Sequence, residues 1–298
     1  MTLASQLNDK QLEAMKYTQG PLLVLAGAGS GKTSVITRKI AYLVKHCGIP
    51  AHRITAMTFT NKAAREMKER VTKLLSREEA KGLSVSTFHT FGLNLLRLEL
   101  KHTPLKANFS ILDADDCKRI LMDLMHRDNL SGAELIAKAM KMISDWKNDL
   151  IAPEQAHTTC ETPEDIQFAH LYQLYERNLR AYNAVDFDDL IVMPTRLLQE
   201  NAEVRDKWQN RVRYLLVDEY QDTNTAQYIL VKLLVGVMGQ FTAVGDDDQS
   251  IYAWRGAKPE NMALLKDDFP NLKVIKLEQN YRSTSRILKA ANTVIGNN

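Results

Sequence analysis

Short apolar runs recur near both ends of the chain, and polar or glycine-rich residues follow each of them. Stretches with the apolar spacing of a helix lie between the runs, for example SVITRKIAYLVKHC and AQYILVKLLV. The runs occupy residues 21–26, 53–60, 83–88, 213–220, 241–246 and 272–278. Alternation of buried strands and amphipathic helices predicts an α/β fold built on a doubly wound parallel sheet. Functional residues in such sheets gather where the strands end.

The middle of the chain has a different pattern. From about residue 90 to 210 almost every stretch has helical spacing, as in CKRILMDLMHRD and FAHLYQLYERNLRAY. The sequence therefore predicts a helical subdomain, residues 89–205, inserted between the two parts of the α/β domain, 1–88 and 206–276.

Residues 26–33 read AGAGSGKT and lie between a strand pattern and a helix pattern. Such a turn lets backbone N–H groups cradle phosphates at a helix N-terminus. Lys32 would reach the β- and γ-phosphates, and the Thr33 hydroxyl would bind Mg²⁺. Ala26 departs from the strict pattern, which has glycine there, and a chance glycine-rich turn is the alternative. We expect a P-loop nucleotide site made by Ala26, Gly27, Ala28, Gly29, Ser30, Gly31, Lys32, Thr33 and Ser34.

The run LLVDE at 215–219 delivers two adjacent carboxylates at a strand end. Asp218 would hold Mg²⁺ and Glu219 would accept a proton from the attacking water. Asp222 is a candidate cap for the next helix. A GTPase is disfavoured, because the one Asn-Lys pair, at residues 61–62, has Ala64 where guanine-reading loops have aspartate. Gln11 has an amide suited to adenine, although an ordinary helix-surface position is the alternative.

Three further segments carry candidate chemistry. TFTNKAAREM at 58–67 and SVSTFHTFG at 84–92 offer Phe59, Thr60, Asn61, Thr87 and His89 to a nucleic acid. Spacing alone favours a core Phe59 and a capping Asn61 instead. GDDDQSIYAWRGA at 245–257 combines acids with aromatics and arginine. DFDDL at 186–190 is a possible metal site, but a helix start with acids in its first turn is the better interpretation.

Composition narrows these possibilities only a little. The 298 residues are 45% hydrophobic and carry a formal charge of +3, so nucleic-acid binding would need a local basic groove. Three dispersed cysteines, without a CxxC pair, disfavour a disulfide framework or zinc ribbon and fit a reducing cytosol. The polar start MTLASQLNDKQ and the short apolar runs predict a soluble, cytoplasmic protein without membrane contact.

The motifs in order are LNDKQ, AGAGSGKT, TFTNKAAREM, STFHTFG, DFDDL, LLVDEYQDT, VGDDDQSIYAWRGA and LEQNYRS. As a set they resemble superfamily 1 DNA helicases of the Rep/UvrD/PcrA group, from residue 7 to the end. The stretches WKNDL, RYLLVDEYQDTNT and VIKLEQNYRS resemble the bacterial Rep branch of that group.

The resemblance implies a RecA-like P-loop ATPase that uses ATP and Mg²⁺. It implies catalytic and phosphate-binding roles for Lys32, Thr33, Asp218, Glu219, Gln249 and Arg282. It implies adenine contacts for Gln11 and Tyr281. It also implies DNA contacts for Phe59, Thr60, Asn61, Thr87, His89, Tyr252, Trp254 and Arg255. Ser34 departs from the group, which usually has an arginine there, so adenine packing would lose one face.

The resemblance also sets the expected function, an ATP-dependent 3′→5′ single-stranded DNA translocase and helicase in replication or repair. Its partners would be single-stranded DNA, single-strand/duplex junctions, replication-fork proteins and further copies of itself. Residues 277–298 would begin a second RecA-like domain, so we expect a fragment with weak hydrolysis alone. The alternatives are a recombination or repair motor without unwinding, an inactive ATP- or DNA-binding module, and an RNA substrate.

Overall fold

The computed structural model of the chain describes residues 3, 6–249, 251, 253 and 256–295. The chain divides into two compact units, which are described here one at a time. The sheet unit contains Met1–Thr87, Lys207–Thr223 and Leu234–Asn298, and the helical unit contains Phe88–Asp206 and Asn224–Leu233.

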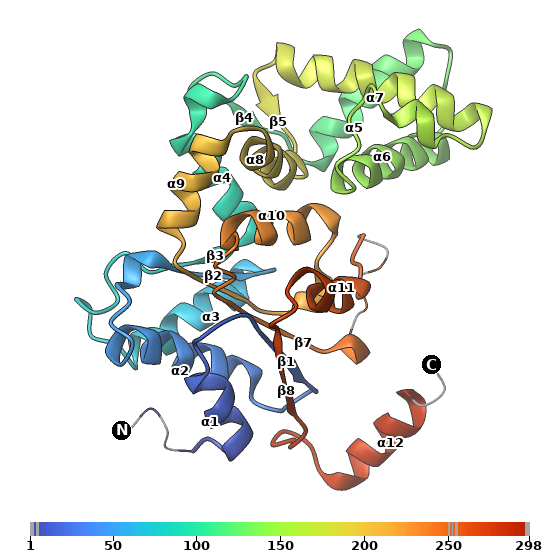
Figure 1. The fold of residues 1–298 in the computed structure, drawn as a ribbon. Coiled ribbons are helices and arrows are strands. Elements are labelled where there is room, and N and C mark those ends of the chain that lie inside the picture. Colours follow the sequence, from blue (N-terminus) through green and yellow to red (C-terminus); the bar gives the residue numbers. More distant parts are fainter. Residues whose placement is uncertain (1–2, 4–5, 250, 252, 254–255, 296–298) are drawn as a thin grey trace. The chain divides into compact units, whose positions relative to one another are not determined.

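A six-stranded sheet forms the centre of the sheet unit, in the order β3-β2-β6-β7-β1-β8 (Figure 1). Every described pairing in it is parallel; Val24, for example, lies between Val244 and Ile275. The strands are β1 Leu22–Ala26, β2 Ile54–Thr58, β3 Ser84–Thr87, β6 Tyr214–Val217, β7 Phe241–Gly245 and β8 Lys273–Leu277. The predicted α/β class and all six strands are therefore confirmed. Near-continuous burial of β2, β6 and β7 explains their unbroken apolar runs.

Most helices of the sheet unit bury their apolar sides against these strands, whereas α12 buries none of its side chains. They are α1 Asp9–Lys16, α2 Lys32–Lys45, α3 Asn61–Thr72, α11 Glu260–Asp268 and α12 Ser285–Ile295. Ile36 and Ile40 of α2 and Met67 of α3 join one buried cluster with Val24 and Leu216 of the sheet. Short 3₁₀ turns, η1 Ala51–Arg53, η4 Tyr220–Asp222 and η5 Asp247–Gln249, complete the unit.

The strand order places the candidate chemistry at one edge of the sheet. β6, β7 and β1 are consecutive neighbours, and the parallel pairing makes all three end at the same side. The residues after β1 are the glycine-rich turn, those after β6 are Asp218 and Glu219, and those after β7 are 246–249. Motifs that are far apart in the sequence therefore converge at the carboxyl ends of three adjacent strands.

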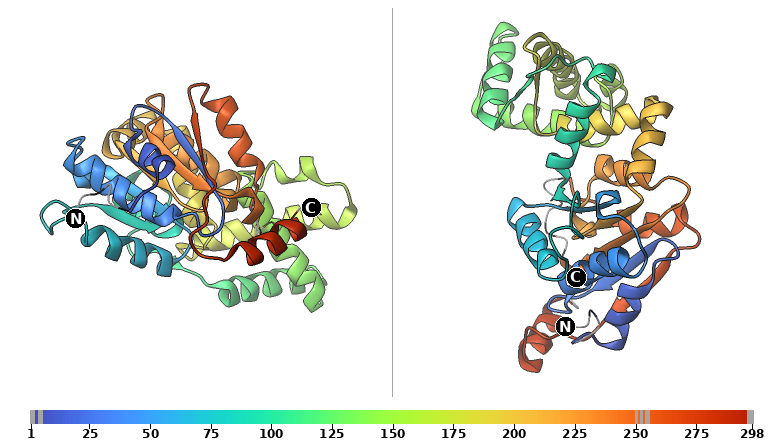
Figure 2. Two further views of the ribbon diagram at one scale, coloured as in Figure 1. Left: turned by 90° about the horizontal axis from the view of Figure 1, so that it is seen from below. Right: turned by 90° about the vertical axis from the view of Figure 1, so that its left-hand side faces the viewer.

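The helical unit packs α5, α6 and α7 side by side around a separate core (Figure 2). Its helices are α4 Phe88–Leu98, α5 Ala114–Arg127, α6 Ala133–Asn148, α7 Pro163–Ala181 and α8 Asp189–Glu200, with most of α10 Thr225–Val235; α9 Ala202–Arg211 starts in it and ends in the sheet unit. The unit also holds the 3₁₀ turns η2 Leu100–His102 and η3 Ala156–Thr159. The helical character of this region is as predicted. The sequence missed a two-stranded parallel ribbon, β4 Ser110–Ile111 with β5 Ala184–Val185, because each strand has only two residues.

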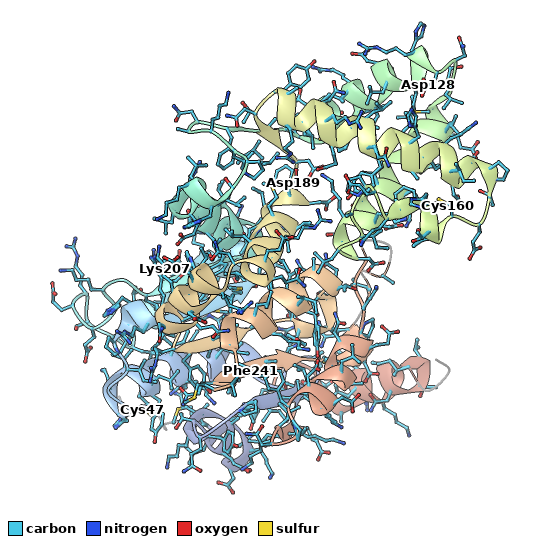
Figure 3. The ribbon with its side chains drawn as sticks, turned by 45° about the horizontal axis from the view of Figure 1, so that its top comes forward. Cys47, Asp128, Cys160, Asp189, Lys207 and Phe241 are labelled. Atoms are coloured by element: carbon cyan, nitrogen blue, oxygen red, sulfur yellow. The ribbon has the colours of Figure 1, made fainter. Side chains whose placement is uncertain are left out.

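Two chain-wide properties can be read directly. Cys47, Cys117 and Cys160 are free thiols, and Figure 3 labels the first and the last of them. Among the residues that the structure describes, no helix combines the length and the apolar character that crossing a bilayer requires.

Candidate functional site

The turn between β1 and α2 has the backbone conformation of a phosphate cradle. Gly29 and Gly31 have φ values of +73° and +83°, a region that side chains with a Cβ rarely adopt. A Cβ on Gly31 would lie 2.6 Å from Nε2 of Gln11, and a Cβ on Gly29 would lie 2.6 Å from Cβ of Arg282. The Ser30 hydroxyl donates to the carbonyl of Gly27 at 2.7 Å and closes the turn. Glycine is therefore required at both positions by conformation and by space.

The N-terminus of α2 faces this turn without a side-chain cap. Gly31 occupies the N-cap position, so the first N–H groups of the helix are left for a ligand. Nζ of Lys32 is buried, with no hydrogen-bond partner among the described residues. Its nearest carboxylate oxygen is Oε2 of Glu219, 3.5 Å away. A buried ammonium held next to free N–H donors is suited to a polyanion.

Asp218 and Glu219 follow β6 as the sequence predicted, and the backbone turns the two carboxylates to different sides. Glu219 has φ 51° and ψ 46°, a left-handed conformation that costs a non-glycine residue about 1–3 kcal/mol. This turn lets Asp218 stay buried while Glu219 lines the pocket. Burial, with the neighbouring Glu219 charge, raises the pKa of Asp218 to about 6. Asp222 has its pKa raised to about 6 for the same two reasons, and its Oδ1 is buried without a hydrogen-bond partner among the described residues.

Asp222 does not cap the following helix, contrary to the expectation from sequence. It lies within the 3₁₀ turn η4, and α10 begins at Thr225. Asn224 takes the capping role, since its Oδ1 accepts the N–H of Gln227 at 2.9 Å and Oε1 of Gln227 accepts the N–H of Asn224 at 2.9 Å. The carboxylate of Asp222 instead remains close enough to Lys32 and Glu219 for their charges to affect it.

Gln11 and Tyr281 reach the turn from opposite ends of the chain. Gln11 is buried; its Nε2 donates to the carbonyl of Ser30 at 2.9 Å and its Oε1 accepts the N–H of Asn8 at 3.0 Å. The helix-surface alternative for Gln11 is therefore wrong. Tyr281 is half-exposed, its N–H donates to the carbonyl of Gly29 at 3.0 Å, and its hydroxyl accepts from Nδ2 of Asn8 at 2.8 Å. Both residues flank the turn, and their contact with adenine stays a prediction.

Lys32, Glu219 and Tyr281 line one cavity of about 320 Å³, within the range of ligand pockets, whereas Gln11 and Asp218 lie outside its walls. Its walls are Ala28, Gly29, Ser30, Gly31, Lys32, Thr33, Ser34, Arg70, Glu219, Gln249, Tyr281 and Arg282. Ala26 and Gly27 lead into the turn without lining the cavity. Oγ of Ser34 accepts from Nε of Arg38 at 3.2 Å, so a guanidinium lies one helical turn from Ser34.

Sequence reasoning missed two residues of this cavity region. Arg70 lines the cavity from α3, where it is one of several cations on a charged face, and nothing in the spacing singled it out. Asn280, from the segment after β8, contacts the turn. Its Nδ2 donates to the carbonyl of Ala28, and its Oδ1 accepts the N–H of Arg282 at 2.8 Å. The motif QNYRS contained this signal, because amides next to aromatic and cationic residues are suited to fixing a loop.

The oxygen ligands near this cavity suit a Mg²⁺ ion that is held partly by substrate and water better than a metal held entirely by protein side chains. Mg²⁺ takes hard oxygen ligands and usually binds one or two protein groups together with water and substrate phosphates. Asp218 and Thr33 supply such oxygens. The described residues contain no cluster of three or more His, Cys, Asp or Glu side chains arranged to hold a metal. The residues present therefore fit a magnesium ion that arrives with a nucleotide.

The predicted DNA-contacting residues of the sheet unit follow two adjacent strands. Phe59, Thr60 and Asn61 come directly after β2, and Thr87 ends the neighbouring β3. Thr60 caps α3 by accepting the N–H of Ala63 at 3.1 Å, so a capping Asn61 is wrong and Asn61 is left exposed. Phe59 is half-buried, and its contact with a nucleic acid stays a prediction.

The remaining DNA predictions belong to other parts of the chain. His89 lies in α4 of the helical unit, its ring 6.0 Å from that of Phe187, and burial lowers its pKa. Tyr252, Trp254 and Arg255 lie outside the described residues. Asp248 donates its N–H to Oδ1 of Asp246 at 3.2 Å.

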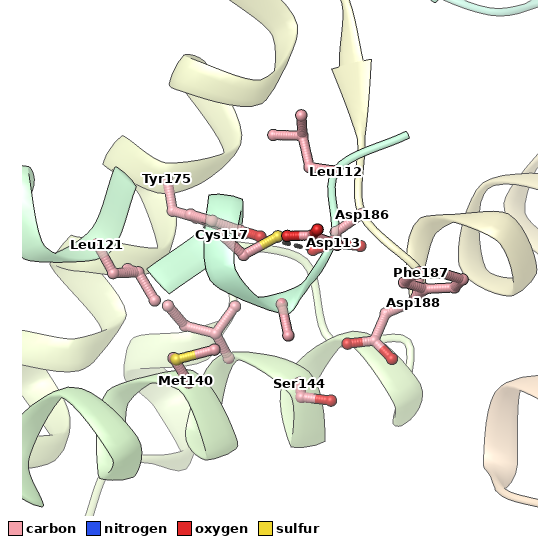
Figure 4. Close-up of a pocket in the computed structure, with 12 residues that line it drawn as sticks. Leu112, Asp113, Cys117, Leu121, Met140, Ser144, Tyr175, Asp186, Phe187 and Asp188 are labelled. Atoms are coloured by element: carbon pink, nitrogen blue, oxygen red, sulfur yellow. Dashed lines mark hydrogen bonds between the residues drawn. The ribbon is translucent and has the colours of Figure 1, made fainter. Parts of the chain in front are cut away.

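DFDDL forms a salt-bridge cluster around a buried lysine that the sequence did not reveal. α8 begins at Asp189, so the predicted helix start is confirmed. Nζ of Lys147 lies 2.8 Å from Asp186, 3.0 Å from Asp189 and 2.5 Å from Glu176. Burial opposes a charged Lys147, but the three carboxylates raise its pKa well above the usual value. Asp186 and Asp188 border an adjoining small cavity with Tyr175 and Cys117 (Figure 4).

Comparison with known proteins agrees with this geometry. Residues 7–270 match the UvrD/REP helicase N-terminal domain. The chain is 58% identical to the ATP-dependent DNA helicase Rep of Escherichia coli K12 over 98% of its length, and 44% identical to the ATP-dependent DNA helicase PcrA of Staphylococcus aureus Mu50 over 99%. It spans 44% and 40% of those two relatives. The chain belongs to the UvrD/REP helicase family through its N-terminal domain.

Proposed function

We propose that this chain is the ATP-binding core of a DNA translocase and helicase that moves 3′→5′ on single strands. One observation carries the proposal: a single cavity joins the uncapped N-terminus of α2 to Lys32, Glu219, Gln249 and Arg282, and Nζ of Lys32 has no hydrogen-bond partner among the described residues. A triphosphate is the ligand whose charge this combination fits. The names of the relatives, ATP-dependent DNA helicases, support the same assignment.

The proposed chemistry is in-line attack of water on the γ-phosphate. Glu219 orients the water and takes its proton, while Lys32, Gln249 and Arg282 stabilise the charge on the phosphoryl oxygens. Asp218 and Thr33 would hold Mg²⁺, which neutralises charge between the β- and γ-phosphates. Tyr281 and Gln11 would bind adenine.

DNA would pass the ends of β2 and β3 and the segment after β7. Phe59, Thr60, Asn61 and Thr87 would contact the strand there, with His89 from α4 and with Tyr252, Trp254 and Arg255. In this proposal residues 1–88 and 206–276 form the first RecA-like domain, 89–205 is its helical insert, and 277–298 opens a second domain. The target would be single-stranded DNA and its junctions with duplex, with fork proteins or a second copy as partners.

Three variants of the whole protein test the assignment. Lys32→Ala should abolish nucleotide binding, measured with a fluorescent ATP analogue. Glu219→Gln should keep the affinity for ATP while lowering hydrolysis by about 10²–10⁴-fold, because it removes a general base. Trp254→Ala should weaken oligonucleotide binding by about 1–3 kcal/mol, the contribution of stacking on a base. Retained nucleotide affinity in Lys32→Ala would remove the P-loop from the proposal.

Strand displacement separates this function from a motor that does not unwind. The protein is offered duplexes with a 3′ or a 5′ single-stranded tail, and release of the shorter strand is followed with ATP present. The proposal predicts release from the 3′-tailed substrate and loss of release in Lys32→Ala. DNA-stimulated hydrolysis without release from either substrate would instead indicate translocation alone.

A further inference from the structure

Gln221 is a buried glutamine with both ends of its side-chain amide engaged. It lies in η4, two residues after Glu219, and only 1% of its surface is exposed. Its Nε2 donates to Oε2 of Glu219 at 2.8 Å. Its Oε1 accepts the N–H of Asp246 at 3.0 Å. A single amide therefore joins the residue that follows β7 to the carboxylate that we propose as the catalytic base.

The two partners fix the orientation of this amide. The Glu219 carboxylate can only accept and a backbone N–H can only donate, so the amide cannot be reversed without losing both bonds. Gly245 allows the close approach: a Cβ there would lie 2.8 Å from Oε1 of Gln221 and 3.0 Å from Sδ of Met262. Movement of Asp246 relative to β6 must therefore break a buried bond or move the Glu219 side chain with it.

The hydrogen-bonded chain continues past Asp246 towards Gln249. The Asp246 carboxylate accepts the N–H of Asp248 at 3.2 Å and the side-chain amide of Gln249, and its carbonyl accepts the N–H of Gln249 at 3.1 Å. Gln249 lines the nucleotide cavity. The same segment runs on to Tyr252 and Trp254, which lie outside the described residues and which the proposed function assigns to DNA.

We propose that Gln221 is a positioning residue that couples the Glu219 carboxylate to the segment starting at Asp246, so that ATP and single-stranded DNA strengthen each other's binding through it. The inference rests on the proposed function, since it needs both ligands. Coupling of this kind is reciprocal, and a device of two buried hydrogen bonds is strong enough to carry the usual 5–150-fold effect.

The experiment measures that coupling directly in the whole protein. The dissociation constant of a non-hydrolysable ATP analogue is determined with and without a saturating thymidine oligonucleotide, and their ratio is the coupling factor. Gln221→Met keeps the length of the side chain and removes both bonds, so the ratio should fall to near one while the affinity without DNA changes little. Gln221→Glu keeps the acceptor for Asp246 but sets a carboxylate against Glu219; hydrolysis should fall by about 10–100-fold.

Gln227 provides a matched control. It is also a buried glutamine, but it exchanges hydrogen bonds with Asn224 at the start of α10. Gln227→Met should lower the melting temperature and leave the coupling factor unchanged. A purely structural Gln221 would behave in the same way, so the coupling factor distinguishes the two roles.

Each outcome decides one of the two proposals. A wild-type coupling factor retained in folded Gln221→Met overturns the inference, and so does a wild-type factor of one. If Gln221→Met fails to fold, Gln221→Glu decides by the same ratio, which should drop. Failure of both variants to fold, with Gln227→Met folded, assigns Gln221 to the core and overturns the inference too. Nucleotide binding that persists in Lys32→Ala instead counts against the proposed function.

Discussion

Two clusters in this protein place a lysine against carboxylates, and they differ in how fully the charges are paired. In the helical unit, Lys147 is 1% exposed and has three carboxylates within 3.0 Å. In the sheet unit, Lys32 has one carboxylate oxygen at 3.5 Å and no hydrogen-bond partner among the described residues. The chain itself satisfies the first lysine and leaves the second one to be satisfied by a ligand.

The difference shows how to separate structural from functional charge clusters. A buried charge is tolerated when the fold supplies its partners, and its removal then leaves those partners unpaired. A charge that lacks partners reduces the stability of the free protein and gains its partner on binding. Asp186 shows the first case: although burial alone raises its pKa, Lys147 lowers it. Asp218 is less fully compensated: it accepts the N–H of Glu219 at 2.9 Å, but burial and the Glu219 charge still raise its pKa to about 6.

The largest expected effect on stability comes from removing Lys147 from its cluster of three carboxylates. Lys147→Met would leave Asp186, Asp189 and Glu176 without their shared cation, and should lower the free energy of unfolding by about 3–5 kcal/mol. Urea denaturation measures this loss. Lys138→Met is the control, because Lys138 is exposed and lies 3.6 and 3.9 Å from its acidic partners; its effect should stay below about 1 kcal/mol. Equal effects of the two variants would contradict a structural role for the cluster.

The unsatisfied lysine should respond in the opposite way. Lys32→Met removes an ammonium that has no hydrogen-bond partner among the described residues and one ion-pair contact, 3.5 Å from Glu219, so the free energy of unfolding should stay equal or rise. Binding of an ATP analogue should be abolished, as in Lys32→Ala, because the charge-assisted hydrogen bond to the phosphates is lost. Denaturation and fluorescence titration on the same preparation measure both quantities. Lys45→Met, at the other end of α2, is the control and should change neither. A large loss of stability in Lys32→Met would place Lys32 with the structural lysines.

A third buried lysine, Lys39, extends the comparison to the pH dependence of the free energy of unfolding. Lys39 is fully buried, and its ammonium is held by the backbone carbonyls of Ala14 and Tyr17, with the Tyr214 ring 5.6 Å away. Burial lowers its pKa to about 7. Between pH 7 and the unfolded value of 10.5 the unfolded chain binds more protons, so stability should rise with pH by up to about 1.4 kcal/mol per unit. Urea denaturation at several pH values should show this rise weakened in Lys39→Met. An unchanged slope would mean that Lys39 keeps an ordinary pKa.

The smallest effect on stability is expected at Arg180, on the exposed side of the Lys147 cluster. Arg180 is about one quarter exposed and lies 3.0 Å from Asp189 and 3.5 Å from Glu176. Because solvent screens it and Lys147 remains, Arg180→Met should lower the free energy of unfolding by only about 1 kcal/mol or less. Denaturation next to Lys147→Met gives the ratio directly. A loss as large as that of Lys147→Met would show that the cluster depends on both cations equally.

Much of the nucleotide site was predictable because its parts are local in sequence. A strand, a glycine turn and a helix start are set by neighbouring residues, so the AGAGSGKT turn, Asp218 and Glu219 were found from pattern alone. Tyr281 and Arg282 were found only through resemblance to a family. Arg70 was missed because it does not differ in pattern from the other cations of α3, and Asn280 was missed although it lies within the motif QNYRS.

The pairings over long sequence distances were not predictable. Lys147 lies 39 residues from Asp186 and 42 from Asp189, and a single sequence does not say which lysine will meet DFDDL. The same holds for Gln221, whose acceptor end meets Asp246 25 residues later because β6 and β7 are neighbours in the sheet. The sequence allowed Asp222 and Asn61 as caps, and the structure gave that role to Asn224 and Thr60.

The sequence by itself determined the alternation of strands and helices, the phosphate-binding turn and the carboxylates at strand ends, since short-range sterics and hydrophobic periodicity control all three. Only the tertiary structure decided which charges are paired. Strand order brought the ends of β6, β7 and β1 together. Lys32, without a hydrogen-bond partner among the described residues, therefore differs from Lys147, which has three carboxylates, because a buried charge depends on its partners in place of water.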